Sequence, residues 1–294
     1  MLQQTQVATV VAYYHEWLRR FPDFAALARA SENDVLRLWQ GLGYYARARN
    51  LHATAKLVIR RHRGRFPESI DQMQQLPGIG KYTAHAVATF AFNQSVPIIE
   101  ANTARVLTRL FDFRRSIESG VGSKTLWERA ASLVPKSNAR IYNSALTDLG
   151  AVVCVPRKPK CFVCPVKKFC RAENPAALPI KKPRPRIKQM TEEHAFILHR
   201  KRVLLEQSRC RWRGMWILPP LRSSPSYQPL HISRFPFTDH RITLMVYRGS
   251  VPKRIAPTQR WFESIDCIPM PSPHRRVIED LIVRSDRSKQ ANCR

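Results

Sequence analysis

Long apolar runs are missing from this sequence of 294 residues, so no stretch reaches the roughly 20 residues that a membrane-spanning helix needs, and we expect no membrane partner. Acidic residues are also scarce: 21 Asp and Glu stand against 50 Lys and Arg, which gives a formal net charge of +29. Such an excess is typical of proteins that bind a polyanion, because each neutralised phosphate releases a condensed counterion. A basic protein without a nucleic-acid partner is the alternative, and charge alone does not separate the two.

The N-terminus lacks the pattern of a secretory signal, since residues 1–7 are polar and the following apolar stretch has no small-residue cleavage site. We therefore expect a cytoplasmic protein, nucleoid-associated if bacterial, whose thiols stay reduced. Disulfides then do not explain the seven cysteines. Three of them are scattered, and four fall within residues 154–170.

Apolar residues at helical spacing predict a run of helices over residues 1–173, namely 3–21, 33–40, 46–62, 80–92, 103–112, 123–133 and 138–150. The first of these helices is expected to carry its apolar side chains on one face: Val7, Val10, Val11, Tyr14, Trp17, Leu18 and Phe21.

The periodicity changes after the proline-rich, basic segment 174–190, which we expect to be an extended linker. Strand patterns over 193–207 and 242–251 and a helix near 274–283 predict a smaller α+β domain over 191–285. A disordered tail is expected over 286–294.

Residues 76–84, with the sequence LPGIGKYTA, lie where a turn leads into a helix. Gly78 and Gly80 permit positive φ and a close approach of the backbone, and the free amides of the next helix would point at an anion. A DNA phosphate is the expected occupant. A plain glycine-capped turn between two helices is the alternative, which the length of the whole string disfavours.

Four cysteines, Cys154, Cys161, Cys164 and Cys170, are separated by six, two and five residues. Zinc sites of four thiolates are usually built from two close pairs, whereas this segment has only one. Cubane iron–sulfur clusters also take four thiolates and tolerate varied spacing. The spacing by itself therefore favours a cluster while leaving zinc open.

Together with the hairpin and the cysteine spacing, the strings MLQQTQV at 1–7 and GLGYYARARNL at 41–51 resemble the helix-hairpin-helix DNA glycosylases, and among them the MutY-type adenine DNA glycosylases. The resemblance is close over about the first 170 residues and loose thereafter. It implies a mainly α-helical glycosylase domain whose four cysteines hold a [4Fe-4S] cluster, followed by a smaller α+β, MutT-like domain. A basic, metal-binding structural protein would not explain these motifs together.

The function that this resemblance implies is monofunctional base excision repair: hydrolysis of the N-glycosidic bond of adenine mispaired with 8-oxoguanine or guanine in double-stranded DNA, by a monomer. Such an enzyme flips its target nucleotide out of the stack. The DNA-binding residues that the resemblance implies are Gln3, Gln4, Thr5, Tyr44, Gly78, Gly80, Tyr82 and Thr83. A solvated first turn for the glutamines and helix packing for the tyrosines are the simpler interpretations.

Position 82 separates this chain from bifunctional relatives, which carry a Schiff-base lysine two residues after the second hairpin glycine. Tyr82 occupies that position, while Lys81 lies one residue earlier. Because a helix turns about 100° per residue, Lys81 is expected to point elsewhere, and we predict no strong β-lyase activity.

The catalytic carboxylates implied by the resemblance depart from the family pattern. The general-acid glutamate would lie two residues before the MLQQT segment, and so before Met1. Glu100 stands where the family has aspartate, with an expected role in stabilising the sugar cation. Asn102 is expected to cap the following helix and support that carboxylate. A catalytically weak or inactive DNA-binding homologue is therefore the alternative, and we also expect exposed apolar surface where the preceding helical segment would pack.

The C-terminal domain is expected, by resemblance, to read 8-oxoguanine on the opposite strand. Residues 214–219 fit the family's glycine–tryptophan–proline strand. The lesion-recognition residues would be Phe237, Thr238, Asp239 and His240, although the family usually has histidine where Asp239 stands, with His240 as a shifted substitute. The carboxylate-rich helix of MutT pyrophosphohydrolases is missing, so we predict no nucleotide hydrolysis.

Overall fold

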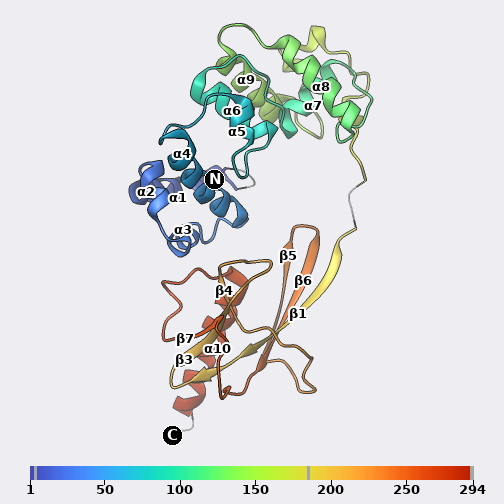
Figure 1. The fold of residues 1–294 in the computed structure, drawn as a ribbon. Helices are drawn as coiled ribbons and strands as arrows, with labels where there is room; N and C mark the ends of the chain where they lie inside the picture. Colours follow the sequence, from blue (N-terminus) through green and yellow to red (C-terminus); the bar gives the residue numbers. More distant parts are fainter. Residues whose placement is uncertain (3–4, 184–185, 292–294) are drawn as a thin grey trace. The chain divides into compact units, whose positions relative to one another are not determined.

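The structure, a computed structural model, describes residues 1–2, 5–183 and 186–291 and consists of two compact units. One unit comprises Met1–Gly64 together with Pro185–Arg294, and the other comprises Arg65–Arg184 (Figure 1). The second boundary falls inside the segment 174–190 that the sequence predicts to be a linker. Gln3 and Gln4 lie outside the described residues.

The N-terminal part of the first unit is a group of four helices: α1 (Val7–Arg20), α2 (Phe24–Arg29), α3 (Glu32–Leu38) and α4 (Ala46–His62). Asp23 caps α2 by accepting a hydrogen bond from Ala26 N at 2.7 Å, and Ser31 caps α3 in the same way. The sequence did not predict α2, because six residues are too few to display a helical period. α1 begins at Val7, four residues later than predicted.

The apolar side chains of α1 lie on one face, but only one edge of that face is buried. Val10, Trp17 and Phe21 at its C-terminal cap are buried. A second stripe is exposed at Val7, Val11, Tyr14 and Leu18, with exposed fractions of 65%, 48%, 50% and 42%. The spacing of 4, 3 and 4 residues keeps this second stripe together along the helix, so an apolar surface is open to solvent. The predicted apolar face is therefore present, with one edge buried and the other exposed.

The second unit is helical. Its elements are α5 (Ile70–Gln74), α6 (Lys81–Phe92), α7 (Ala101–Leu110), α8 (Gly120–Leu133) and α9 (Ala139–Asp148), followed by the short helical segments η1 (Leu149–Val153), η2 (Cys161–Val163), η3 (Lys167–Phe169) and η4 (Pro175–Ala177). The start of the predicted linker packs onto this unit: Leu178 is buried, and its carbonyl accepts a hydrogen bond from Arg109 Nε at 3.3 Å. Residues 174–182 are therefore not a free extended segment.

The C-terminal part of the first unit is α+β, as predicted, and contains two sheets. Its elements are β1 (Lys188–Phe196), β2 (Leu198–His199), β3 (Arg202–Gln207), β4 (Trp216–Ile217), β5 (His231–Phe237), β6 (His240–Arg248), β7 (Gln259–Phe262) and α10 (Ser272–Ala291). One sheet has the order β1-β6-β5, with β1 parallel and β5 antiparallel to β6. In the other sheet β3 pairs with β2, β4 and β7.

α10 supplies Val277, Ile278 and Leu281 to the core beneath the sheets, where they pack with Leu205 and Leu244. The helix continues to Ala291, past the predicted end near residue 283, so most of the segment predicted to be a disordered tail is helical. Within the described residues, no helix is long and apolar enough to cross a membrane.

Candidate nucleic-acid interface and cysteine loop

The hairpin between α5 and α6 turns at Gly78, whose φ of +77° favours glycine. Gly80 is the N-cap of α6, and among the described residues no side chain caps this helix. A Cβ built on Gly80 would meet nothing within 4 Å, so the backbone here is open to a ligand. Because α6 is a helix of 12 residues, its uncapped N-terminus attracts an anion through its free amides and its dipole.

The three side chains that follow Gly80 have different environments. The Lys81 ammonium lies 4.1 Å from the centre of the Trp127 ring on α8, in a cation–π contact that engages it there. Tyr82 is 40% exposed. Burial, and then the negative charge of Glu100, raise the pKa of the Tyr82 phenol. Thr83 is half-buried.

Glu100 is the N-cap of α7. Its Oε1 accepts a hydrogen bond from Thr103 N at 2.9 Å, and Thr103 Oγ1 accepts one from Glu100 N at 2.8 Å, which completes a capping box. One carboxylate oxygen is thus fixed by the helix that follows it, which orients the other.

Asn102 does not cap α7, contrary to the prediction. Its Oδ1 accepts a hydrogen bond from Arg105 Nη2 at 2.9 Å. The Asn102 backbone also packs closely against Gly150, where an added Cβ would lie 2.9 Å from the Asn102 carbonyl oxygen. Because Glu100 already occupies the N-cap, Asn102 is left to hold the arginine one turn further along the helix.

Tyr44 and Tyr45 have different environments. Tyr44 is 51% exposed and has a φ of +48°, a conformation that a bulky residue adopts only when its surroundings impose it. Tyr45 packs against the core of α1–α4. Helix packing therefore accounts for Tyr45, while Tyr44 is presented to solvent.

Arg47 organises the loop around Tyr44. Its guanidinium lies 5.3 Å from the centre of the Trp39 ring and 5.5 Å from that of Tyr44. It also donates to the Met1 carbonyl at 2.9 Å and to Thr5 Oγ1 at 3.5 Å. The start of the chain and the Tyr44 loop therefore meet at one side chain.

The cysteine loop is joined to α7 by two buried arginines. Arg109 Nη1 lies 3.3 Å from Cys154 Sγ, and the Arg109 carbonyl lies 3.5 Å from Cys170 Sγ. Arg105 Nε donates to the Cys154 carbonyl at 2.8 Å. The first and last cysteines of the loop thus both contact Arg109, Cys154 at its guanidinium and Cys170 at its backbone carbonyl, although their sequence positions are 16 apart.

Cys161 is the first residue of the short 3₁₀ helix η2, and Cys164 is its C-cap. Over the described residues, no three His, Cys, Asp or Glu side chains come together as a metal-binding group. The donor chemistry nevertheless suits a thiophilic centre: four thiols lie in one loop, and an arginine donates to the sulfur of one of them.

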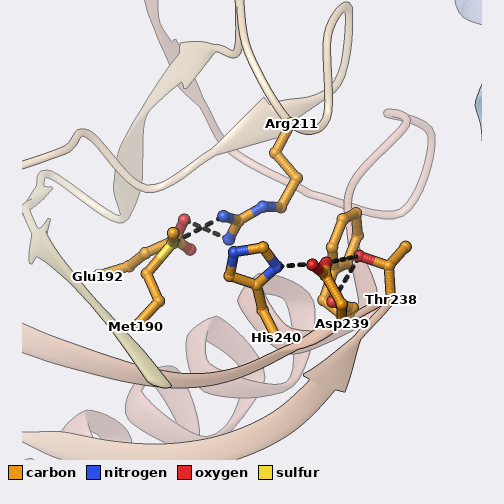
Figure 2. Close-up of polar contacts among 7 residues, drawn as sticks. Met190, Glu192, Arg211, Thr238, Asp239 and His240 are labelled. Atoms are coloured by element: carbon orange, nitrogen blue, oxygen red, sulfur yellow. Dashed lines mark hydrogen bonds and ion pairs between the residues drawn. The ribbon is translucent and has the colours of Figure 1, made fainter. Parts of the chain in front are cut away.

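The predicted lesion-recognition residues form the turn between β5 and β6 (Figure 2). Thr238 has a φ of +52°. Asp239 Oδ1 accepts from His240 Nδ1 at 2.7 Å and from Thr238 Oγ1 at 3.1 Å. The hydrogen bond from Thr238 is the largest of the effects that lower the pKa of Asp239.

Four arginines that organise these sites were not predicted from the sequence: Arg47, Arg105, Arg109 and Arg211. Arg109 could have been found, because it follows Arg105 by four residues on a helix whose other positions are largely apolar or small, and a buried charge requires partners. Arg211 carries no comparable local signal, since its partners come from distant strands.

Known proteins resemble much of this chain. A family model described as "HhH-GPD superfamily base excision DNA repair protein" matches residues 1–131. The chain is 44% identical over 175 residues to the adenine DNA glycosylase of Homo sapiens, an alignment that covers 59% of this chain and 32% of the relative. It is 42% identical over 172 residues to that of Buchnera aphidicola subsp. Baizongia pistaciae, covering 58% and 48%.

A third relative extends the aligned region. The adenine DNA glycosylase of Buchnera aphidicola subsp. Schizaphis graminum is 31% identical over 224 residues, covering 74% of this chain and 65% of the relative. The chain therefore spans less than two thirds of the length of these curated relatives.

Solved structures share the helical fold. A thermostable thymine-DNA glycosylase matches with a TM-score of 0.53 and 32% identity, covering 58% of this chain and 78% of the other. An endonuclease III in a non-covalent DNA complex matches with a TM-score of 0.50 and 23% identity over the same shares, a likeness that speaks for the fold alone.

Proposed function

Because residues 1–131 match the HhH-GPD superfamily of base excision DNA repair proteins, we propose that the chain belongs to this superfamily and is a monofunctional DNA glycosylase that removes adenine mispaired with 8-oxoguanine or guanine. The observation that carries this proposal is a pair of helix N-termini that follow one another in the chain: the uncapped N-terminus of α6 at Gly80, and the carboxylate of Glu100 fixed at the N-cap of α7. Burial, and then the charge of Glu100, raise the pKa of the Tyr82 phenol in the first turn after Gly80, which agrees with this arrangement. Cleavage of an N-glycosidic bond in DNA requires that the sugar-phosphate backbone be held and that an anion lie near the sugar; protonation of the departing base is the third requirement.

In this proposal Gly80 and the amides after it bind a DNA phosphate, while Glu100 faces the sugar whose base departs. Oε1 is held by the amide of Thr103, so the oriented Oε2 stabilises positive charge that develops on the sugar. Glutamate reaches one C–C bond further than aspartate would. The capping box compensates by fixing the carboxylate to the helix.

We assign to Tyr44 the stacking contact that accompanies nucleotide flipping. Its exposed ring, its left-handed backbone and its contact with Arg47 support this role, because a fixed aromatic face can replace a displaced base. Thr5 lies in the same Arg47 network. Gln3 and Gln4 are proposed as its neighbours from the sequence resemblance alone.

The four cysteines would hold a [4Fe-4S] cluster, and both Cys154 and Cys170 contact Arg109 of α7. When bound, the cluster would supply a covalent cross-link for the loop. The loop's own lysines, among them Lys158, Lys160, Lys167 and Lys168, give it a positive surface suited to DNA.

We further propose that the C-terminal α+β module is MutT-like and reads the base opposite the adenine through Phe237, Thr238, Asp239 and His240. The protein would act as a monomer on DNA in the cytoplasm or nucleoid.

Single-turnover excision from duplexes that contain A:8-oxoguanine or A:G tests the proposal directly. Release of adenine, with strand cleavage only after alkali, is expected of a monofunctional glycosylase. Tight binding to the mispair without release of adenine would instead identify a DNA-binding homologue with little catalysis. A covalent complex trapped with borohydride on abasic DNA would overturn the monofunctional assignment.

A further inference from the structure

A charged pair lies beneath the turn between β5 and β6 and is not part of it. Arg211, in the segment between β3 and β4, donates Nη1 to Glu192 Oε1 of β1 at 2.6 Å (Figure 2). Its Nη2 contacts Met190 Sδ at 2.8 Å. The side chains of Arg211 and Glu192 are only 19% and 21% exposed, so this pair is more shielded than an ordinary surface ion pair.

The strand register explains why the pair lies near the turn. Met190 and Glu192 pair with Ile242 and Leu244 of β6, which pair in turn with positions on β5. Paired residues point to the same face of a sheet, and positions two apart share that face. His240 is two residues before Ile242, so its side chain lies on the face that Arg211 covers.

Arg211 also contacts the turn itself. Its guanidinium lies 5.0 Å from the centre of the Phe237 ring and 5.8 Å from that of Trp212. Trp212 is buried and meets Phe237 edge-on at 5.9 Å. The first residue of the turn is therefore held by a cation and an indole that both come from the segment after β3.

Removing Arg211 alone from its ion pair with Glu192 would destabilise this part of the sheet. Glu192 Oε2 is buried and has no hydrogen-bond partner among the described residues, so Arg211 supplies the only ion pair of this carboxylate there. Burial, opposed by Arg211, raises the pKa of Glu192. Loss of the guanidinium would leave a shielded carboxylate uncompensated, and the sheet face would rearrange around it.

We propose that Arg211 is a positioning residue for recognition of the base opposite the target adenine. Its ion pair with Glu192 and its cation–π contact with Phe237 fix the turn in which Asp239 and His240 meet that base. This inference rests on the proposed function, because it assumes that the turn reads 8-oxoguanine. It assigns the selectivity of the turn to a side chain 26 residues before it in the sequence.

The test compares Arg211→Lys with Arg209→Lys in the full chain. Both substitutions keep the net charge, and Arg209 is an exposed arginine of the same segment, so non-specific attraction to DNA is matched. Fluorescence anisotropy with labelled duplexes gives the ratio of the Kd for A:G to the Kd for A:8-oxoguanine. We expect Arg211→Lys to lower this ratio about tenfold, because lysine keeps the charge but loses the planar guanidinium that contacts Glu192, Met190 and the Phe237 ring at once. Arg209→Lys should leave it unchanged.

Two further measurements separate the inference from the function on which it rests. Hydrogen–deuterium exchange of residues 235–241 in the free protein should become faster in Arg211→Lys and in Glu192→Gln, and the double variant should exceed neither single variant by much. If the wild-type chain shows no preference for 8-oxoguanine but exchange responds as described, the proposed lesion reading fails while the anchoring of the turn stands. If the wild type discriminates and Arg211→Lys retains both the ratio and the slow exchange, the role of Arg211 is refuted.

Discussion

The helical second unit and the C-terminal α+β module build their candidate sites in different ways. In the helical unit the hairpin is made of neighbours in the sequence: a turn at Gly78, an open N-terminus at Gly80 and, one helix later, the capped Glu100. In the α+β module the turn at 237–240 depends on Glu192 and Arg211, which arrive from other strands and loops. A site built from local backbone geometry can be recognised in the sequence, whereas one assembled across a sheet needs the strand register first.

The largest expected effect concerns Glu100. Glu100→Gln keeps an oxygen that can accept from Thr103 N but removes the charge, so the cap should persist while stabilisation of the sugar cation is lost. Single-turnover adenine excision should fall by about 10²–10³-fold, measured in the chain or in a form extended upstream by a glutamate-containing segment. Glu128→Gln, an exposed carboxylate of the same unit, is the control. Unchanged excision would remove Glu100 from the mechanism.

The cysteine loop should be the next most sensitive element. Cys154→Ser removes the sulfur that Arg109 contacts, and the purified chain should lose most of about four iron atoms and its brown colour. Cys210→Ser alters an exposed cysteine outside the loop and should retain the iron. The iron content and the visible absorption spectrum of the purified proteins measure the loss of the cluster. If the wild-type chain contained stoichiometric zinc instead of iron, the four cysteines would form a zinc site and not a cluster.

A smaller effect tests whether the open backbone at Gly80 holds a DNA phosphate. Gly80→Ala places a methyl group in open space, so the free energy of unfolding should change little, while DNA affinity should fall about tenfold as the phosphate is kept away. Gly120→Ala, also in open space but at the start of α8, should affect neither quantity strongly. Equal affinities of the two variants would argue against the phosphate at Gly80.

The α+β module should show the smallest effect, a dependence of stability on pH. His274 is fully buried, and burial is the main cause that lowers its pKa well below 6.5, with repulsion from His194 second. Below pH 6.5 the unfolded chain therefore takes up a proton that the folded state refuses, so stability falls as pH falls.

Urea unfolding between about pH 7.5 and about pH 5.5 measures this dependence, with a slope of at most about 1.4 kcal/mol per pH unit from one histidine. His274→Gln should flatten the slope, since an amide oxygen can still accept from Leu218 N but does not titrate. His15→Gln, at an exposed histidine of α1, should leave the slope as it is. A slope that survives in His274→Gln would assign the dependence elsewhere, with His194 as the next group to replace.

Most of the helices followed from the sequence, because a helix that buries one face repeats its apolar residues every three or four positions. The bounds of α4 and those of α6 agree with prediction to within one residue. The short helices α2 and α5 were missed. The predicted linker begins too early, because Leu178 packs on the helical unit and its carbonyl accepts a hydrogen bond from Arg109 of α7. Those outcomes depend on which surfaces meet, and a local pattern does not contain that information.

For the candidate site, the sequence by itself determined the chemistry: the glycine turn at 78–80, the carboxylate at Glu100, the four thiols and the strong positive charge. Only the tertiary structure decided how these groups are held. It made Glu100 rather than Asn102 the cap of α7, and it separated the exposed Tyr44 from the packed Tyr45. The reason is physical: residue types set which interactions are possible, but burial and partners across the fold determine which of them form.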